Sequence, residues 1–376
     1  MKVNLILGLV LLSFSNLAFS QKQLPVIKAN SITVDIKEDN NLMKGVWRIV
    51  PEEKPDIHLT SSKEVTFYTD IDSISFKIKP NEVYDFIILL NGKDSAYTQI
   101  KYQPSRLDML KEAEKYNYND TRFIPKFTYQ SLNDSNLVRI RRDFKLDSIA
   151  GEGNEVSQIL NLMHWVHTVV QHDGNTYNPE PRNTENLIKV CREENRGVNC
   201  RMMATILNEC YLAMGIKSRF ITCMPKETEF DDCHVINMVY SNDLEKWIWI
   251  DPTFDAYIMN EKGELLGIEE VRERLIQGKP LILNPDANWN RKESQTKAYY
   301  LEQYMAKNLY RLQTTLVSEY NSERSKSGEV YTYVELLPLD GIEQEPQKEE
   351  IENKEKGTKW IYYKTNNPKL FWAKPE

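Results

Sequence analysis

The chain has 376 residues, a formal net charge of -7 and 41% hydrophobic residues. This length suits two or three domains of roughly 100–200 residues each, with enough apolar side chains for buried cores. The modest negative charge excludes the basic surface that recruits nucleic acid, so we expect no nucleic-acid partner.

The first twenty residues are typical of a signal peptide. Lys2 precedes a short apolar run at residues 5–12, and Ala18-Phe19-Ser20 offers small residues for cleavage. The apolar run is shorter than the roughly 20 residues that span a membrane. We therefore predict that residues 1–20 are removed and that the protein is exported, to the periplasm or outside the cell, with no stable membrane span.

Residues 21–103 are predicted to form an all-β sandwich. Short alternating or apolar runs mark strands, and Asn91-Gly92 is a strong hairpin signal between residues 84–90 and 96–100. This region contains no cluster of catalytic residue types. We expect it to have a structural or substrate-positioning role.

Residues 104–295 are predicted to form an α+β domain, because helical patterns come first and strands follow. Gly215 is well placed to end the last of these helices. The predicted helices are 105–116, 155–170, 184–194 and 200–214, and the predicted strands are 218–223, 234–240 and 246–251.

Residues 296–376 are predicted to add a C-terminal helix, an acidic segment and docking strands. Residues 296–324 have a helical composition, and residues 341–357 are rich in Glu and Lys, which indicates a solvated or disordered stretch. The apolar residues 360–363 and 370–372 are expected to dock onto a domain.

Five cysteines follow the predicted signal peptide, and an odd number leaves at least one thiol free in an oxidising compartment. One free thiol and up to two disulfides fit this count, and small buried side chains are the alternative. No cysteine pair has zinc-ribbon spacing. His164 and His167 share a helix face near His172, but no carboxylate or thiol completes a metal site, so we expect no metal and no cofactor.

Cys200 is the main candidate for chemistry. It stands where a loop runs into a helix, and His234 and Asp251 follow it in that order. A helix start and a neighbouring His lower the pKa of a thiol, and an Asp orients the His. The backbone N–H of Cys200 would serve as an oxyanion donor.

A hairpin count relates His234 to Asp251. If Asn242-Asp243 is a two-residue turn, His234 lies directly opposite Asp251, within reach of a hydrogen bond. We expect this face of the sheet to pack against the start of the helix that carries Cys200.

Four segments resemble the core of the transglutaminase-like superfamily, which has a papain-like cysteine-enzyme fold: Gly197–Cys200, Gly215–Arg219, His234 and Trp247–Asp251. The chain is similar to exported bacterial-type members. The resemblance implies a triad of Cys200, His234 and Asp251, with Cys200 as the nucleophile. The superfamily includes protein cross-linkers, proteases and deglycosylating amidases.

The family's usual oxyanion side chain upstream of the cysteine is not identifiable in this sequence. Gln171, His172 and Trp165 are the candidates, and Trp165 also fits a helix core.

Two functions remain open. The first is an exported cysteine acyltransferase or hydrolase that acts on amide bonds of a protein, peptide or glycopeptide, with a protease or amidase favoured over a cross-linker. The alternative is a non-catalytic module that binds peptide or glycan and retains the same fold. An intact triad favours the enzyme.

Overall fold

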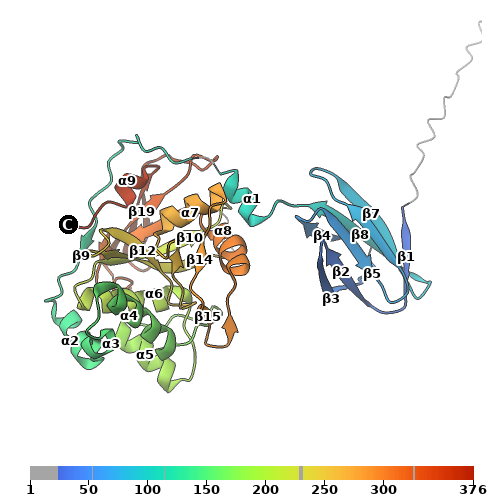
Figure 1. Ribbon diagram of the computed structural model, residues 1–376. Coiled ribbons are helices and arrows are strands. Elements are labelled where there is room, and N and C mark those ends of the chain that lie inside the picture. The colour runs from blue at the N-terminus through green and yellow to red at the C-terminus, as the bar shows by residue number, and fades with distance from the viewer. Residues whose placement is uncertain (1–23, 53, 114, 228–231, 325–326) are drawn as a thin grey trace, which may run out of the picture. The chain divides into compact units, whose positions relative to one another are not determined.

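The computed structural model describes residues 24–376 except 53, 114, 228–231 and 325–326 (Figure 1). The predicted signal peptide therefore lies outside the described residues. The chain divides into two compact units, one ending at Pro104 and the other running from Ser105 to Glu376. None of the described helices is both long and apolar enough to cross a membrane.

The first unit consists of two four-stranded sheets that enclose one core, which confirms the predicted β-sandwich. Asn91 and Gly92 both have positive φ, at 53° and 66°, in the turn of the β7–β8 hairpin. One sheet has the order β1-β7-β8-β4 and the other β3-β2-β5-β6, with β1 Val26–Ala29, β2 Thr33–Glu38, β3 Asn41–Arg48, β4 Asp56–Thr60, β5 Glu64–Tyr68, β6 Ser73–Lys77, β7 Val83–Leu90 and β8 Asp94–Tyr102.

The second unit is built on a seven-stranded sheet. All neighbouring pairs are antiparallel except β19 and β21, which run parallel. The predicted strands that carry His234 and precede Asp251 are confirmed as β11 and β12. The strand order is β12 (Lys246–Ile250), β11 (His234–Ser241), β10 (Ser218–Met224), β17 (Arg311–Thr315), β19 (Val330–Leu336), β21 (Thr358–Thr365) and β20 (Lys348–Asn353).

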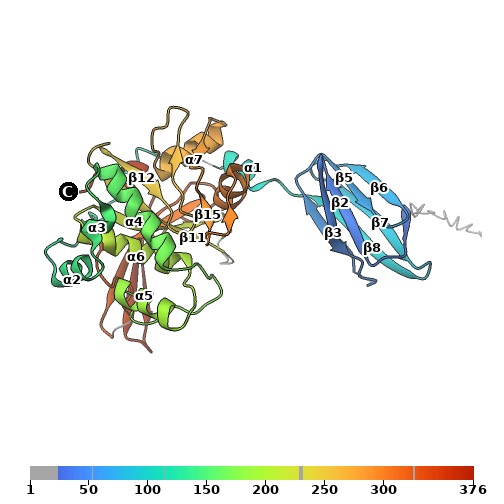
Figure 2. The same cartoon turned by 60° about the horizontal axis from the view of Figure 1, so that its bottom comes forward.

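Helices cover both faces of this sheet, which confirms the predicted α+β class (Figures 1 and 2). One face packs against α2 Ser135–Asp143, α3 Leu146–Ala150, α4 Glu155–Val169, α5 Thr184–Glu193 and α6 Cys200–Ala213. The other face packs against α1 Arg106–Lys111, α7 Ile268–Gln277, the π-helix η1 Ala298–Met305, α8 Ala306–Asn308 and α9 Pro368–Phe371.

Helix α6 is the central helix of the second unit. Its N-cap is Asn199, whose side chain accepts a hydrogen bond from the Met202 N–H at 3.1 Å. It ends at Ala213, and Gly215, which follows the C-cap residue Met214, has a φ of 78° as predicted for a glycine at a helix C-terminus. Residues 202–213 are all buried, so the helix start is held in place by packing along the whole helix.

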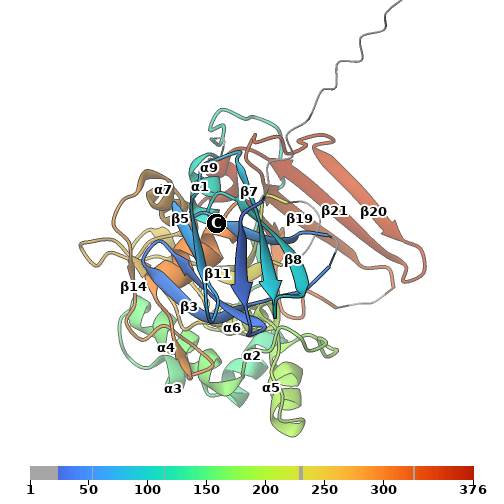
Figure 3. The same cartoon turned by 90° about the vertical axis from the view of Figure 1, so that its right-hand side faces the viewer.

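The C-terminal region differs from the prediction. The helical segment ends at Asn308, and β17 and β18 (Val317–Ser318) occupy residues predicted to be helical. Composition favoured a helix there, but pairing with β10 and β19 fixes an extended chain. Lys348–Asn353 forms β20 within the Glu- and Lys-rich stretch, and Figure 3 shows β19, β21 and β20 side by side.

Short strand pairs complete the unit. They are β9 Thr128–Tyr129 with β18, β13 Ile258–Met259 with β14 Ile282–Leu283, and β15 Asn288–Trp289 with β16 Glu293–Ser294. The pair β15–β16 carries Trp289.

Candidate functional site

The β11–β12 hairpin has a four-residue loop instead of the predicted two-residue turn. Ser241 pairs with Lys246 and Asn237 with Ile250, so His234 does not lie directly opposite Asp251 and the predicted register is wrong. Glu155 explains the longer loop, because its carboxylate accepts hydrogen bonds from Ser241, Asn242 and Asp243. Relative to the predicted register, each β11 residue faces a β12 residue two positions further along the chain. A shift by an even number of residues leaves every side chain on the same face of the sheet.

His234 and Asp251 therefore still meet. The His234 Nε2 and Asp251 Oδ2 atoms are 2.7 Å apart, and the two side chains are 1% and 0% exposed. Diagonal neighbours on one sheet face lie within reach of long side chains. The same Oδ2 accepts the Tyr300 hydroxyl at 2.6 Å, and Oδ1 accepts the Thr253 N–H at 2.9 Å. Both carboxylate oxygens are thus satisfied and fixed.

Tyr300 is a site residue that the sequence did not reveal. Its hydroxyl donates to Asp251 and accepts the Trp249 indole N–H at 3.1 Å, and both aromatic side chains are fully buried. Tyr300 lies in η1, about 50 positions beyond Asp251, and no local spacing links the two. The segment was predicted to be helical, but periodicity alone does not identify which helix residue contacts a distant carboxylate.

Helix α6 packs on the face of the sheet opposite to the predicted one. Asn237 donates to the Ala204 carbonyl at 3.0 Å, and Val235 clusters with Ala204 and Cys200. His234 points to the other face, since side chains alternate along a strand. Cys200 and His234 are each the first residue of their element, so they meet at the end of the sheet and not across its face.

The surroundings of Cys200 favour its thiolate. Burial raises the pKa of the Cys200 thiol, but interactions with His172 and His234 outweigh burial and lower that pKa to about 6. Burial lowers the pKa of His234, whereas Asp251 and then Cys200 raise it, to about 10. At a pH between these two pKa values, Cys200 is a thiolate and His234 an imidazolium. A thiolate paired with an imidazolium is the activated form of a cysteine nucleophile.

The two ring nitrogens of His234 have separate partners. Nε2 is occupied by Asp251, and Nδ1 is buried without a hydrogen-bond partner among the described residues. Nδ1 is therefore the nitrogen that remains for exchange of a proton with the Cys200 thiol.

His172 is held beside Cys200 by a short bridge to Val198. The Val198 N–H donates to the Gln171 carbonyl and the Asp173 N–H to the Val198 carbonyl, both at 2.9 Å. A Cβ on Gly197 would lie 2.7 Å from the Gln171 carbonyl oxygen, so this approach requires glycine. The loop before α6 thus fixes the position of His172.

Trp289 sets the orientation of His172. Its indole N–H donates to His172 Nδ1 at 3.1 Å. An indole has no acceptor, so Nδ1 accepts and the proton of the neutral ring lies on Nε2. The Asn290 side chain holds the His172 backbone through hydrogen bonds of 2.7 and 2.9 Å. His172 is thereby presented as an N–H donor.

The other two oxyanion candidates lie elsewhere. The Gln171 side chain is exposed, and Trp165 packs against Phe144 with ring centroids 5.8 Å apart. Of the three candidates, His172 is the one whose side chain affects the Cys200 thiol.

His164 and His167 do not converge with His172. His164 Nδ1 lies 2.7 Å from Asp255, and both ring nitrogens of the buried His167 face oxygen acceptors, the Pro252 carbonyl and Asn288 Oδ1. Within the part of the chain that the structure describes, no group of three His, Cys, Asp or Glu side chains is arranged to hold a metal.

All five cysteines are unpaired, so the structure contains neither of the two disulfides that the count allowed. Three of them, Cys191, Cys210 and Cys223, are buried as small side chains. Cys233 is partly exposed, and burial raises the pKa of its thiol to about 11, in contrast to Cys200.

Two hollows border the site, and Trp289 lines both. The aromatic hollow measures about 610 Å³ and is lined by Phe254, Trp289, Glu293, Ser294, Gln295, Thr296, Tyr299 and Tyr304. The polar hollow measures about 620 Å³ and is lined by Gln171, His172, Asp173, Gly174, Asn175, Asn195, Arg196, Gly197 and Trp289.

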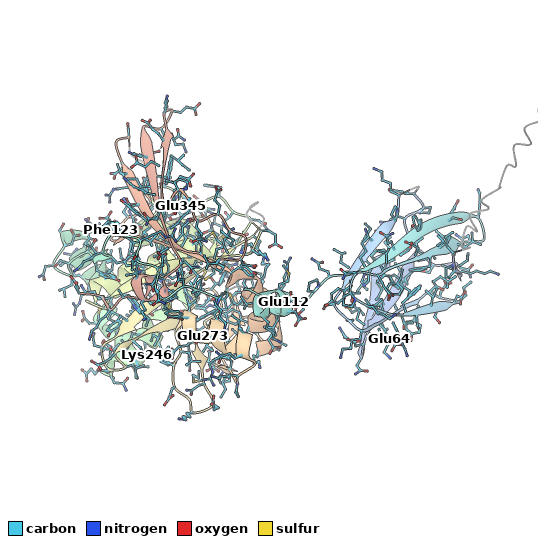
Figure 4. All side chains as sticks on the ribbon, turned by 90° about the horizontal axis from the view of Figure 1, so that it is seen from above. Glu64, Glu112, Phe123, Lys246, Glu273 and Glu345 are labelled. Atoms are coloured by element: carbon cyan, nitrogen blue, oxygen red, sulfur yellow. The ribbon has the colours of Figure 1, made fainter. Side chains whose placement is uncertain are left out.

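A third hollow, of about 550 Å³, lies between α7, the β11–β12 hairpin and the C-terminal segment. Figure 4 labels Lys246, one of its lining residues, and Glu273 of α7. Lys246 forms an ion pair of 2.6 Å with Glu270 there. None of the residues around Cys200 lines this hollow, so it is separate from the site.

Residues 142–252 match the family model of the transglutaminase-like superfamily, which confirms the predicted resemblance for this segment. The segment contains Cys200, His234 and Asp251. No curated protein matches the chain.

Among solved structures, the chain is similar to a putative cysteine protease from Cytophaga hutchinsonii and to red sea bream transglutaminase. The first has 15% identity and a TM-score of 0.24, with 46% of this chain and 62% of that chain covered. The second has 11% identity and a TM-score of 0.23, with 61% of this chain and 49% of that chain covered. The chain thus spans less than two thirds of either protein.

Proposed function

We propose that this protein is an exported cysteine hydrolase or acyltransferase that acts on amide bonds of a protein, peptide or glycopeptide. One observation carries the proposal: a thiol at the start of α6, with a pKa lowered to about 6, lies beside the buried His234–Asp251 pair. A purely structural cysteine has no need of a thiolate.

The proposed reaction starts with attack of the Cys200 thiolate on the amide carbonyl carbon. Negative charge then develops on the carbonyl oxygen, and the Cys200 backbone N–H and the His172 N–H are the proposed donors to it. His234 gives its proton to the leaving nitrogen, and the C–N bond breaks to leave a thioester on Cys200. Asp251 stabilises His234 in its imidazolium form before this proton transfer and holds the orientation of the neutral ring after it.

Water is the proposed second nucleophile. His234, now neutral, takes a proton from the water as it attacks the thioester, and the C–S bond breaks to release the acid and regenerate the thiolate. We favour hydrolysis over cross-linking, because water is always present.

A screen of peptide and glycopeptide amides by mass spectrometry tests the proposal. The wild type should convert at least one substrate class, Cys200→Ala should convert none, and Cys233→Ala serves as a matched control that keeps its activity. Equal conversion by the wild type and Cys200→Ala would show that this thiol is not the nucleophile.

Export is part of the proposal and has its own test. We expect the mature protein to be recovered outside the cytoplasm with Gln21 as its first residue, by N-terminal sequencing. A cytoplasmic chain that keeps Met1 contradicts this part alone.

A further inference from the structure

We propose that the aromatic hollow binds the amine portion of the substrate, and that this portion carries an aromatic ring. The proposal rests on the function proposed above and specifies the substrate class. When the thioester forms, the hollow holds the amine that leaves. When an amine instead of water attacks the thioester, the hollow holds that incoming amine.

The aromatic hollow lies next to His234. Phe254 and Tyr304 line the hollow, and their rings lie 5.5 and 5.2 Å from the His234 ring, measured between centroids. His234 is the group that protonates the leaving nitrogen in the proposed reaction. The substituent on that nitrogen therefore leaves past these two rings.

The walls of the hollow are largely aromatic. Phe254, Trp289, Tyr299 and Tyr304 contribute four aromatic side chains, and Tyr299 is 52% exposed. Aromatic rings prefer edge-to-face or offset contact with another ring, and such contacts add to the effect of burying apolar area. The walls thus favour an aromatic substituent over a small one.

The polar side chains of the hollow indicate which polar group the ligand carries next to its aromatic ring. Gln295 Oε1 is buried and accepts no hydrogen bond from the described residues, while its Nε2 donates to the Glu293 carbonyl at 3.0 Å. An N–H donor on the ligand would satisfy Oε1. The residues that line the hollow include the acidic Glu293 and no Lys or Arg, which disfavours a ligand carboxylate. An uncharged carboxamide fits both features.

The reaction of the thioester with an amine follows from the same geometry. The amine nitrogen attacks the thioester carbonyl carbon, His234 takes one N–H proton, and the C–S bond breaks. The products are an amide, the Cys200 thiolate and the imidazolium form of His234, so atoms and charge balance. By microscopic reversibility, the site that releases an amine also accepts one.

Amine competition on the full-length mature protein tests the proposal. The probe 4-nitrophenyl acetate acetylates the thiolate, and the ratio of acetylated amine to acetate is measured with phenylalaninamide, glycinamide or glucosamine as acceptor. Background rates from Cys200→Ala are subtracted. We expect phenylalaninamide to capture at least about tenfold more acetyl group than glycinamide, the factor that an aromatic contact and burial of one ring support.

Tyr299→Ala should reduce the preference for phenylalaninamide over glycinamide, since this side chain lines the hollow and is 52% exposed. The preference is a ratio of products from one acetyl-enzyme, so a change in the rate at which Cys200 is acetylated does not alter it. Phe123→Ala is the matched control, because Phe123, labelled in Figure 4, is 73% exposed and is not among the residues that line the hollow. It should leave the preference unchanged.

The outcomes separate the two proposals. If 4-nitrophenyl acetate gives no release that depends on Cys200, the proposed function fails. If acetylation occurs but phenylalaninamide and glycinamide capture equally, the assignment of the hollow fails alone. Preferential capture by glucosamine would make the hollow a sugar site and also overturn the assignment.

Discussion

Asp251 depends on a residue that lies outside the matched family segment. The Tyr300 hydroxyl and the His234 imidazole share Oδ2 of this carboxylate, and the hydroxyl also accepts from Trp249. The hydrogen bond from Tyr300 therefore weakens the attraction between the Asp251 carboxylate and the His234 imidazolium. That attraction raises the pKa of His234.

Substitution Tyr300→Phe should raise the pKa of His234, because Asp251 then directs more of its charge to the imidazole. The basic limb of the activity profile should move to higher pH. The unpartnered Trp249 N–H should cost about 1–3 kcal/mol of unfolding free energy. Tyr299→Phe, which removes a hydroxyl from a half-exposed neighbour, is the control, and an unchanged basic limb in Tyr300→Phe would contradict this role.

His172 lowers the pKa of the Cys200 thiol, so its removal should raise that pKa. We expect His172→Ala to shift the thiolate titration to higher pH and to lower kcat by about 10²–10³-fold through loss of the proposed oxyanion donor. His172→Gln keeps an N–H donor, so its kcat should be higher than that of His172→Ala. The pKa of the Cys200 thiol should stay raised in both variants. Ultraviolet absorbance of the thiolate and initial rates measure the two effects, and Gln171→Ala is the exposed control.

At the scale of elements, the bridge between residues 171–173 and 197–198 sets the distance from His172 to the start of α6. Gly197→Ala would place a Cβ 2.7–2.9 Å from the Gln171 and Asp173 atoms, so the two segments must separate. We expect a loss of about 1–3 kcal/mol in unfolding free energy and a rise in the pKa of Cys200.

Gly174→Ala is the matched control for this substitution. Its Cβ would meet only His172 Cε1, at 3.6 Å, which is an ordinary van der Waals distance. Denaturant unfolding and thiolate titration should distinguish the two variants. Equal behaviour of Gly197→Ala and Gly174→Ala would show that the bridge does not position His172.

The elements around the site were largely predictable, because each has a strong local signal. Asn199 and Gly215 flank α6, and short, nearly continuous apolar runs mark β11 and β12. The hairpin count correctly placed His234 and Asp251 on the same face of the sheet despite a wrong register, because the register shift is even. It did not predict that α6 packs on the opposite face. The loop length itself depends on Glu155, which lies nearly 90 residues earlier and carries no local signal.

The contacts that complete the site were not predictable, because they join distant segments. Tyr300 reaches Asp251 from η1, and Trp289 reaches His172 from β15. The strand β17 was predicted to be helical because its pairing with β10, which overrides composition, spans almost 90 residues. Long-range pairing of this kind leaves no periodic signal within a sequence window.

At the scale of the whole molecule, the chain consists of two compact units with separate cores. We expect calorimetry to show unfolding that is not two-state, with one transition for each unit. Alkylation of Cys200 should shift only the transition of the unit that contains residues 105–376. A single calorimetric transition whose midpoint shifts on alkylation of Cys200 would contradict separate unfolding of the two units.

The pH dependence of Cys200 alkylation tests the central claim most directly. Iodoacetamide is applied to the mature protein across a pH series, and the label on each cysteine peptide is quantified by mass spectrometry. Because only the thiolate reacts, the Cys200 rate should rise through a midpoint near pH 6, whereas Cys233, with a pKa of about 11, should react only in strong alkali. A Cys200 midpoint at or above that of a free thiol would contradict an activated nucleophile.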